Sequence, residues 1–264
     1  MMIPGGAPAR LVRVHNPFSI DLRVTEIADR LKFVAPTPVV ILAGAKSERP
    51  GKTMAGIARA AFNTGANVID SGLGTCIERF CQRKGVPLIG ICPEAEVDYP
   101  RLNPANRKET ELTNGHTHFF TLGKEKGSGK NNILKWGQEA TLKFDLARRI
   151  TTGRKGGYGG SGAPPCKYIC VVIGDNEASA LADIETAMNQ KLSIIVIDGS
   201  SLSKTILQEL AKRKENPKPD DKVEVGQSKD QILQRLYGYN RVVPCKDNSE
   251  DAASIVHLLL TITL

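Results

Sequence analysis

The strongest constraint on the fold is a regular alternation between strand-like apolar runs and helix-like segments. Residues 38–44 form a short, continuous apolar run, which is typical of a strand buried on both faces. Two further strands follow, and the helical patterns between the three end at Gly65 and Gly85. The strands are expected at residues 38–44, 66–72 and 86–92, and the helices at residues 52–63 and 75–84. A β-α-β-α-β order predicts a parallel sheet with helices on both faces.

The alternation resumes after a polar loop at residues 93–115. Further strands are predicted at residues 116–122, 167–174 and 192–199, with a short edge strand at 242–245. Further helices are predicted at residues 136–150, 180–190, 201–215, 229–237 and 249–260. We therefore expect an α/β, Rossmann-like three-layer fold whose mostly parallel sheet has about six strands. Residues 1–34 are expected to be an N-terminal arm with a short helix at 21–33, irregular over residues 1–17. Residues 35–264 are expected to be a single domain with a C-terminal helical extension.

Composition excludes several classes of protein. With 41% apolar and 24% charged residues, the chain is not collagen-like, a coiled coil or largely disordered. No apolar run approaches the roughly 18 residues that a transmembrane helix needs, so no membrane span is expected. The six cysteines are irregularly spaced and do not suggest a disulfide scaffold, which predicts reduced thiols and a cytoplasmic location.

The net charge of +8 is concentrated in one segment. Residues 124–167 hold ten Lys and Arg against three Asp and Glu, a local excess of +7. Such an excess beside glycines can hold nucleotide phosphates, nucleic acid or an acidic protein surface, and it also suits a solvated loop. Aromatic residues are only 5% of the chain, too few for a base-stacking platform, so nucleic acid is not expected as a partner.

Four of the predicted strands end in glycine and small polar residues. Because the carboxyl ends of parallel strands share one edge of a sheet, these residues should lie where open sheets bind ligands. Glycine lets the backbone approach a phosphate, and the following helix offers N–H groups. The pattern favours a nucleotide-like ligand, although βα-turns also use glycine without one. The four ends are residues 44–47, 71–75, 174–177 and 198–201.

Three motif-like segments do not fit the chemistry they suggest. Residues 44–53 follow a buried strand as a P-loop does, but six residues instead of four separate the two glycines. Residues 157–162 precede a strand, whereas the dinucleotide-binding fingerprint follows one. His116 and His118 would face the same side of a strand, but no third or fourth ligand of matching spacing is visible, so no metal site is expected.

Six segments in a fixed order resemble the SLOG superfamily, and they are most similar to the LSDAT domain. This domain is the N-terminal cytosolic nucleotide-sensing region of TRPM ion channels. The segments are VVILAGAK (39–46), ANVIDSGLGT (66–75), PLIGICPE (87–94), TNGHTHFFTLG (113–123), WGQE (136–139) and YICVVIGDNEASALADIETAMNQKLSIIVIDGSSLS (168–203). The resemblance covers about residues 36–210. It implies a Rossmann-like fold that binds nucleotide-derived ligands, ADP-ribose among them.

The strand ends and the resemblance together define an expected ligand cleft. Its expected ligand-binding residues are Gly44, Ala45, Lys46, Gly72, Gly74, Thr75, Glu139, Gly174, Asn176, Gly199 and Ser200. Where the family has a G-G-P-G-T turn, this chain has Asp175 and Glu177 and no second glycine, and two acids there would repel a phosphate. Enzymatic relatives, the cytokinin-activating phosphoribohydrolases, carry P-G-G-x-G-T-x-x-E at that turn. Here a G-x-G-T-x-x-E segment occurs at residues 72–78 instead.

Three functions remain open at this point. The first is non-enzymatic binding or sensing of a nucleotide derivative such as ADP-ribose or NAD. The second is hydrolysis of a nucleotide N-glycosidic bond, in which Glu78 or Glu139 would stabilise positive charge on the sugar. Lys46 or Arg79 would then hold the phosphate. The third is a structural or adaptor role in a larger assembly, with residues 1–20 and 124–167 docking protein partners. The altered turn argues against an enzyme.

Overall fold

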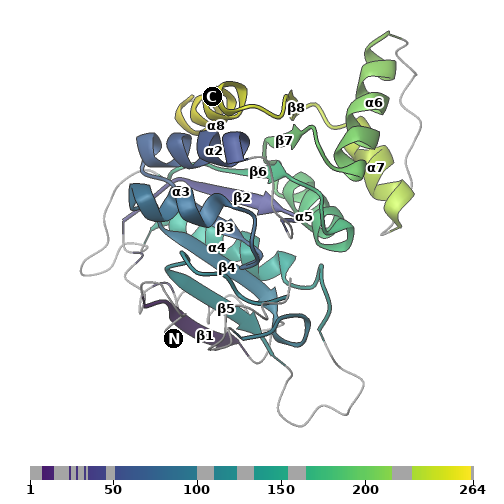
Figure 1. Ribbon diagram of the computed structural model, residues 1–264. Helices are drawn as coiled ribbons and strands as arrows, with labels where there is room; N and C mark the ends of the chain where they lie inside the picture. Colours follow the sequence, from purple (N-terminus) through teal and green to yellow (C-terminus); the bar gives the residue numbers. More distant parts are fainter. Residues whose placement is uncertain are drawn as a thin grey trace.

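The protein is an α/β structure built on a parallel sheet with helices on both faces (Figure 1). The computed structural model describes residues 8–14, 35–45, 51–99, 110–123, 134–153, 165–215 and 228–262, with Val24, Ala28 and Phe33. Within these residues the sheet has eight strands in the order β1-β5-β4-β3-β2-β6-β7-β8, and every neighbouring pair is parallel. The strands are β1 (Arg10–Val14), β2 (Val39–Ala43), β3 (Asn67–Asp70), β4 (Leu88–Pro93), β5 (His118–Leu122), β6 (Tyr168–Val172), β7 (Ile194–Ile197) and β8 (Val242–Cys245).

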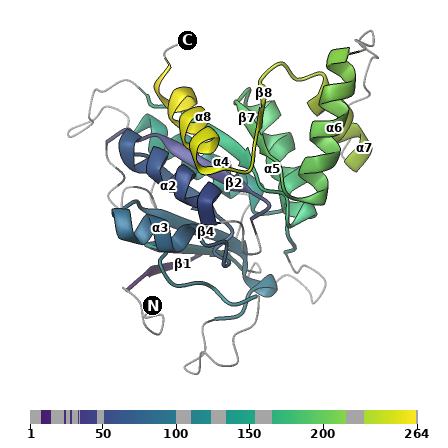
Figure 2. The same cartoon turned by 45° about the horizontal axis from the view of Figure 1, so that its top comes forward.

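The helices form two layers, one on each face of the sheet (Figures 1 and 2). Side chains of α2, α3 and α8 contribute to one apolar core, and those of α4, α5, α6 and α7 contribute to another. The helices are α2 (Gly51–Thr64), α3 (Ile77–Lys84), α4 (Ala140–Thr152), α5 (Glu177–Asn189), α6 (Ser201–Glu215), α7 (Lys229–Tyr237) and α8 (Ser249–Thr261), with a 3₁₀ turn, η2 (Glu94–Glu96). None of the helices in the described ranges is long and apolar enough to cross a membrane.

Strand β2 shows why the sequence of a central parallel strand is continuously apolar. Successive side chains of a strand point to opposite faces. Accordingly, Val39 and Ile41 pack in the core under α4 and α5, whereas Val40 and Leu42 pack in the core under α2 and α8. All four are completely buried. A polar residue at any of these positions would lose its hydration on either face, so the whole run must be apolar.

The expected α/β fold with a mostly parallel sheet is confirmed, but the sheet has two strands more than the approximate count. The short edge strand β8 forms where expected. The other addition is β1, which lies in the stretch 1–17 that the sequence suggested to be irregular, and it pairs in parallel with β5 from Arg10↔His118 to Val14↔Leu122. Strand β1 is a half-exposed edge strand, so its sequence can include the charged residues Arg10 and Arg13. These arginines interrupt the apolar pattern by which a strand is predicted. Of the helix expected at 21–33, only Val24, Ala28 and Phe33 are described; Val24 and Ala28 are helical and buried.

Candidate functional site

The candidate site lies where the strand order of the sheet reverses. From β2 the chain proceeds through β3 to β4 and β5 on one side, whereas β6, β7 and β8 extend the sheet on the other side. The turns after β2 and β6 therefore lead into helices on opposite faces, α2 and α5, and both turns lie at the carboxyl edge of the sheet (Figure 1). In open parallel sheets this switch point is where ligands bind.

The turns after β2 and β6 are hydrogen-bonded to each other. The N–H of Gly174 donates to the carbonyl of Ala43 at 3.1 Å, and the N–H of Asn176 donates to the carbonyl of Gly44 at 2.8 Å. Gly44 has a φ of +68°, and a Cβ there would lie 2.8 Å from the carbonyl oxygen of Asn176 and 2.7 Å from the Cβ of Ala180. Only glycine satisfies both the left-handed backbone and the close approach of α5. The sequence at Gly44 thus fixes how near α5 comes to the end of β2.

The N-terminus of α5 lies at the switch point and is capped by a side chain. The Asn176 side chain accepts from the N–H of Ser179 at 3.4 Å, which satisfies one of the open donors of the first turn. Glu177, in that first turn, pairs with Lys229 Nζ at 2.9 Å, and both side chains are about half-exposed. Of the two acids that the sequence suggested would repel a phosphate, Glu177 is therefore partly neutralised by a lysine from α7, and Asp175 is the other.

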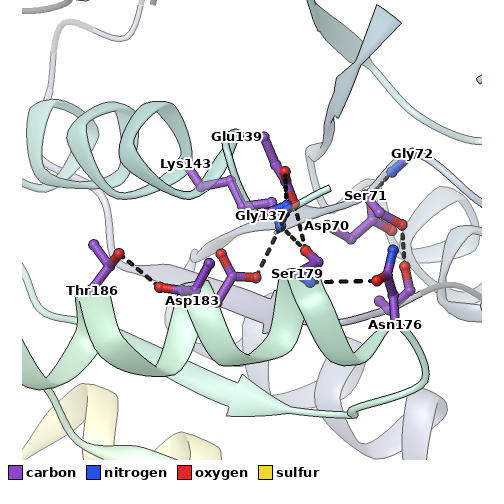
Figure 3. A network of polar contacts seen from close by, with 12 residues as sticks. Asp70, Ser71, Gly72, Gly137, Glu139, Lys143, Asn176, Ser179, Asp183 and Thr186 are labelled. Atoms are coloured by element: carbon purple, nitrogen blue, oxygen red, sulfur yellow. Dashed lines mark hydrogen bonds and ion pairs between the residues drawn. The ribbon is translucent and has the colours of Figure 1, made fainter. Parts of the chain in front are cut away.

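Next to the switch point, four polar side chains form a buried network between α4 and α5 (Figure 3). Lys143 Nζ donates to Glu139 Oε1 at 3.2 Å, to Ser179 Oγ at 3.1 Å and to Asp183 Oδ2 at 2.9 Å. Glu139 also accepts from Ser179 Oγ and, at 2.6 Å, from the N–H of Gly137. We call Lys143, Glu139, Ser179 and Asp183 the buried network, since the first, second and fourth are fully buried and Ser179 is 1% exposed.

The charges of the buried network do not balance. Burial alone would lower the pKa of Lys143, but the charges of Asp183 and Glu139 raise it well above the usual range, so the ammonium stays protonated. Two carboxylates face this one cation. Burial raises the pKa of Asp183, against the opposing charge of Lys143, and Glu139 raises it further. Asp183 Oδ1 is buried and has no hydrogen-bond partner among the described residues. The network therefore holds its excess negative charge under the N-terminus of α5.

A second polar cluster lies under the turn after β3. Asp70 Oδ1 accepts from the N–H of Gly72 at 2.7 Å and lies 2.9 Å from His116 Nε2. His116 Nδ1 lies 3.0 Å from the carbonyl oxygen of Thr113, which can only accept. The hydroxyl of Thr113 also lies 3.3 Å from Nδ1, but the nearest group to each ring nitrogen is an acceptor, which favours a proton on both. Burial would lower the pKa of His116, but the charge and hydrogen bond of Asp70 raise it above its ordinary value.

Glu78 borders this second cluster from α3. It is 8% exposed, and its Oε2 accepts from the N–H of Thr75 at 3.4 Å. Burial raises the pKa of Glu78, and the charge of Asp70 raises it further. The turn after β3 is connected to the switch point, because the hydroxyl of Ser71 donates to the carbonyl of Ala45. The β2 and β3 turns therefore form one continuous edge.

The structure brings most of the expected ligand-binding residues to this edge. Those at the switch point and its neighbouring turns are Gly44, Ala45, Gly174, Asn176, Gly199 and Ser200, and those at the turn after β3 are Gly72, Gly74 and Thr75. Ser200 is connected to β6 through Ser203, whose hydroxyl donates to the carbonyl of Ile173. Glu139 instead points into the α4–α5 interface (Figure 3). Lys46 lies outside the described residues, as do most of the segments 1–20 and 124–167.

Sequence reasoning missed the residues that hold the site together. Lys143, Asp183, Asp70 and His116 were not among the expected site residues. A signal was present, because Glu139 and Lys143 are four residues apart and so lie on one face of a helix. Ser179 and Asp183 have the same spacing. A charged pair on the otherwise apolar face of a helix indicates a partner of opposite charge across the interface. In the described residues, no group of three or more His, Cys, Asp or Glu could hold a metal ion.

Comparison with known families identifies the domain. A family model, LSDAT_prok, described as "SLOG in TRPM, prokaryote", matches residues 37–244. The chain belongs to this family. The match confirms the resemblance to the SLOG superfamily, and it spans β2 to the penultimate residues of β8, including both polar clusters. It leaves out β1, which extends the sheet beyond the matched region.

Other comparisons with the LSDAT_prok domain are less informative. No curated protein matches the chain. Among solved structures, one similar chain is described as the molybdenum cofactor carrier protein MCP from Chlamydomonas reinhardtii. It is 11% identical, with a TM-score of 0.39, and the likeness covers 86% of this chain and 100% of that one. A likeness at this level gives no information about function.

Proposed function

We propose that this LSDAT_prok domain is a non-enzymatic sensor that binds a nucleotide-derived ligand of the ADP-ribose or NAD class at the switch point. The observation that carries the proposal is the hydrogen bond from Asn176 N–H to the carbonyl of Gly44, 2.8 Å long. It brings the N-terminus of α5 and the β2 turn together at the switch point. A phosphate there meets the positive end of the α5 dipole and the first-turn N–H groups that the Asn176 cap leaves open.

The groups that support a phosphate-bearing ligand at the switch point are backbone groups and not side-chain charges. Asp175, Glu177 and the buried network oppose an anion at the N-terminus of α5, and the ion pair with Lys229 reduces only the effect of Glu177. The backbone at Gly44 presents no side chain to the ligand. Recognition in this proposal is thus by backbone groups and by the helix dipole, which suits a diphosphate or a phosphoribosyl group better than a neutral molecule.

The position of Glu139 supports binding without hydrolysis. A carboxylate that stabilises positive charge on a sugar must contact that sugar. The Glu139 carboxylate is fully buried and accepts hydrogen bonds from Lys143, Ser179 and Gly137. Glu78, the other candidate, is almost fully buried, and its raised pKa disfavours the charged form. In this proposal Glu139 is a positioning residue that fixes the start of α4 against α5.

The proposal is tested by isothermal titration with ADP-ribose, NAD and AMP, using Asn176→Asp. Aspartate caps a helix as well as asparagine does, so the fold is preserved. A new negative charge within a few ångströms of the phosphate should weaken binding about tenfold or more at low salt. The matched control is Asn189→Asp, which adds the same charge at the opposite end of α5, next to Arg235. The affinity of Asn189→Asp for the ligands should stay close to that of the unmodified protein.

Two outcomes contradict the proposal. Absence of heat with all three ligands, or equal weakening by both variants, rules out phosphate binding at the N-terminus of α5. Chromatography of the titrated samples separates sensing from hydrolysis: intact ligand is expected. Release of a base or of nicotinamide would instead favour the N-glycosidic hydrolase.

A further inference from the structure

A hollow lies at the opposite edge of the sheet from the switch point. It has a volume of about 300 Å³ and is formed where β6, β7 and β8 begin and where α8 ends. Helix α8 lies over this half of the sheet (Figure 2). Lys167, Lys191 and Arg241 line the hollow from just before the three strands, and Leu259 and Ile262 line it from the end of α8. We call this the amino-edge pocket.

Within the described part of the chain, the three cations of the amino-edge pocket have no carboxylate partner. By contrast, Arg235 pairs with Glu185 and Lys229 pairs with Glu177. Among the residues that the structure describes, no Asp or Glu lies within ion-pair distance of Lys167, Lys191 or Arg241. Three like charges around one hollow repel one another, so an anion bound there would be stabilised.

The wall that carries the cations is held in place by three hydrogen bonds. Arg241 donates to the carbonyl of Lys191, and the hydroxyl of Tyr239 donates to the carbonyl of Leu192 at 2.7 Å. The hydroxyl of Tyr168 donates to the side chain of Gln190. The short turn between α5 and β7 is therefore fixed by Tyr168 of β6 and by Tyr239 and Arg241, which both precede β8. A pocket with such a wall is formed before a ligand arrives, which reduces the entropy lost on binding.

The opposite wall of the amino-edge pocket is apolar and partly open to solvent. Ile262 is 38% exposed, and Leu258, one turn before it on α8, is 53% exposed. Leu259 is half-buried and packs against the α2–α8 core. A bare inorganic anion would leave this apolar wall in water, and a neutral hydrocarbon would leave the three cations unpaired. A ligand with an anionic head and an apolar body satisfies both walls.

We propose that the amino-edge pocket binds a small anionic amphiphile, namely an alkyl carboxylate. Its carboxylate lies among Lys167, Lys191 and Arg241, and its hydrocarbon chain covers Leu259 and Ile262. The pocket volume is at the lower end of the range of small-molecule sites, which limits the ligand to a short or medium chain. This site is separate from the switch point where we propose that a nucleotide derivative binds, because the two lie at opposite edges of the sheet.

The ligand chemistry is tested on the unmodified protein with three probes. Octanoate carries both features, 1-octanol has the chain without the charge, and acetate has the charge without the chain. Binding is followed by saturation-transfer NMR and by isothermal titration. Octanoate should bind saturably and at least about tenfold more tightly than either of the other two, because each lacks one of the two matching walls. Equal binding of 1-octanol, or no saturable binding of octanoate, overturns the proposal.

The location is tested with a charge-matched pair of double variants. Lys167→Gln with Lys191→Asn removes two pocket cations, and asparagine accepts the positive φ of 57° at position 191. Lys204→Gln with Lys212→Asn removes two exposed lysines of α6 and serves as the control. The first pair should weaken octanoate binding about five- to tenfold, and the second should change it less than about twofold. Equal weakening by both pairs would show that only the net charge matters.

A third variant keeps the location testable if the lysine variants fold poorly. Ile262→Gln alters only a partly exposed side chain at the end of α8. It should weaken octanoate and leave the much weaker acetate binding unchanged, because it removes the apolar wall and no charge. Melting temperatures of all variants, followed by circular dichroism, check that the fold is intact. Unchanged octanoate affinity in Ile262→Gln contradicts the proposed position of the hydrocarbon chain.

Discussion

Replacing Lys143 by methionine tests whether the buried network holds α4 against α5. Methionine has nearly the length of lysine without its charge, so the change removes three hydrogen bonds and leaves little empty space. The carboxylates of Glu139 and Asp183 would remain fully buried without a cation. Removing one partner of a buried ion pair destabilises a protein by about 3–5 kcal/mol. For a domain of this size, that lowers the melting temperature by roughly 6–20 °C.

The pH dependence of Lys143→Met distinguishes loss of charge compensation from loss of packing. Without the ammonium, the raised pKa of Asp183 rises further, so the folded state binds more protons than the unfolded state near neutral pH. Stability must then increase as the pH falls. The deficit relative to the unmodified protein should therefore be smaller near pH 5.5 than near pH 8. A packing defect alone would lower the free energy of unfolding by the same amount at both pH values.

Urea unfolding followed by circular dichroism measures both effects. Lys204→Met, at an exposed position of α6, is the matched control and should change the free energy of unfolding by less than about 0.5 kcal/mol. Adding Glu139→Gln and Asp183→Asn to Lys143→Met should recover part of the loss, because the uncompensated charges are then gone. A loss below about 1 kcal/mol that does not vary with pH would refute this account of the network, since that is the effect of a surface pair.

Two further predictions concern His118 and Gly44. Burial lowers the pKa of His118 to about 4, so the stability it contributes is present above pH 6.5 and is lost as the pH falls from about 6.5 to 4. Because His118 is partly exposed, the loss of stability is limited to about 1–2 kcal/mol. In His118→Gln, urea unfolding between pH 6.5 and 4 should not show this loss. If the free energy of unfolding of His118→Gln falls with pH as steeply as that of the unmodified protein, His118 is not its source. Gly44→Ala should lower the free energy of unfolding by about 2–4 kcal/mol, because it combines a positive φ with contacts below 3 Å. Gly65→Ala, at nearly the same φ but with nothing within 4 Å, should cost only about 1 kcal/mol in the same assay, and equal losses would show that the close approach of α5 is unimportant.

The central strands of this fold can be predicted from the sequence because burial on both faces requires each of them to be apolar throughout. The run at residues 38–44 is apolar at every position since β2 is covered on both faces. Helices α6 and α7 form over the predicted residues. An edge strand has no such continuous apolar sequence. In β1, Leu11 lies between Arg10 and Val12, and the half-exposed strand is held in the sheet by its pairing with β5.

The candidate site divides in the same way between local and distant information. Glycines at strand ends are local signals, and the expected residues at Gly44, Gly174 and Ser200 do lie along one edge. The interactions that control charge are not local. Lys143 and Asp183 are 40 residues apart, and Asp70 and His116 are 46 apart. A single sequence contains no measure of which helix faces which, so these pairs could not be deduced from it.

The buried network and the switch point share the first turn of α5. The N–H of Asn176 donates to the carbonyl of Gly44 at the switch point, and three residues later the hydroxyl of Ser179 accepts from Lys143 on the buried side. A displacement of the N-terminus of α5 would therefore also shift the contacts of Lys143. Because those contacts compensate two buried carboxylates, a small displacement would change the energy of the α4–α5 interface substantially. Under the proposed function, a ligand bound at the switch point would thus have a direct physical route to α4.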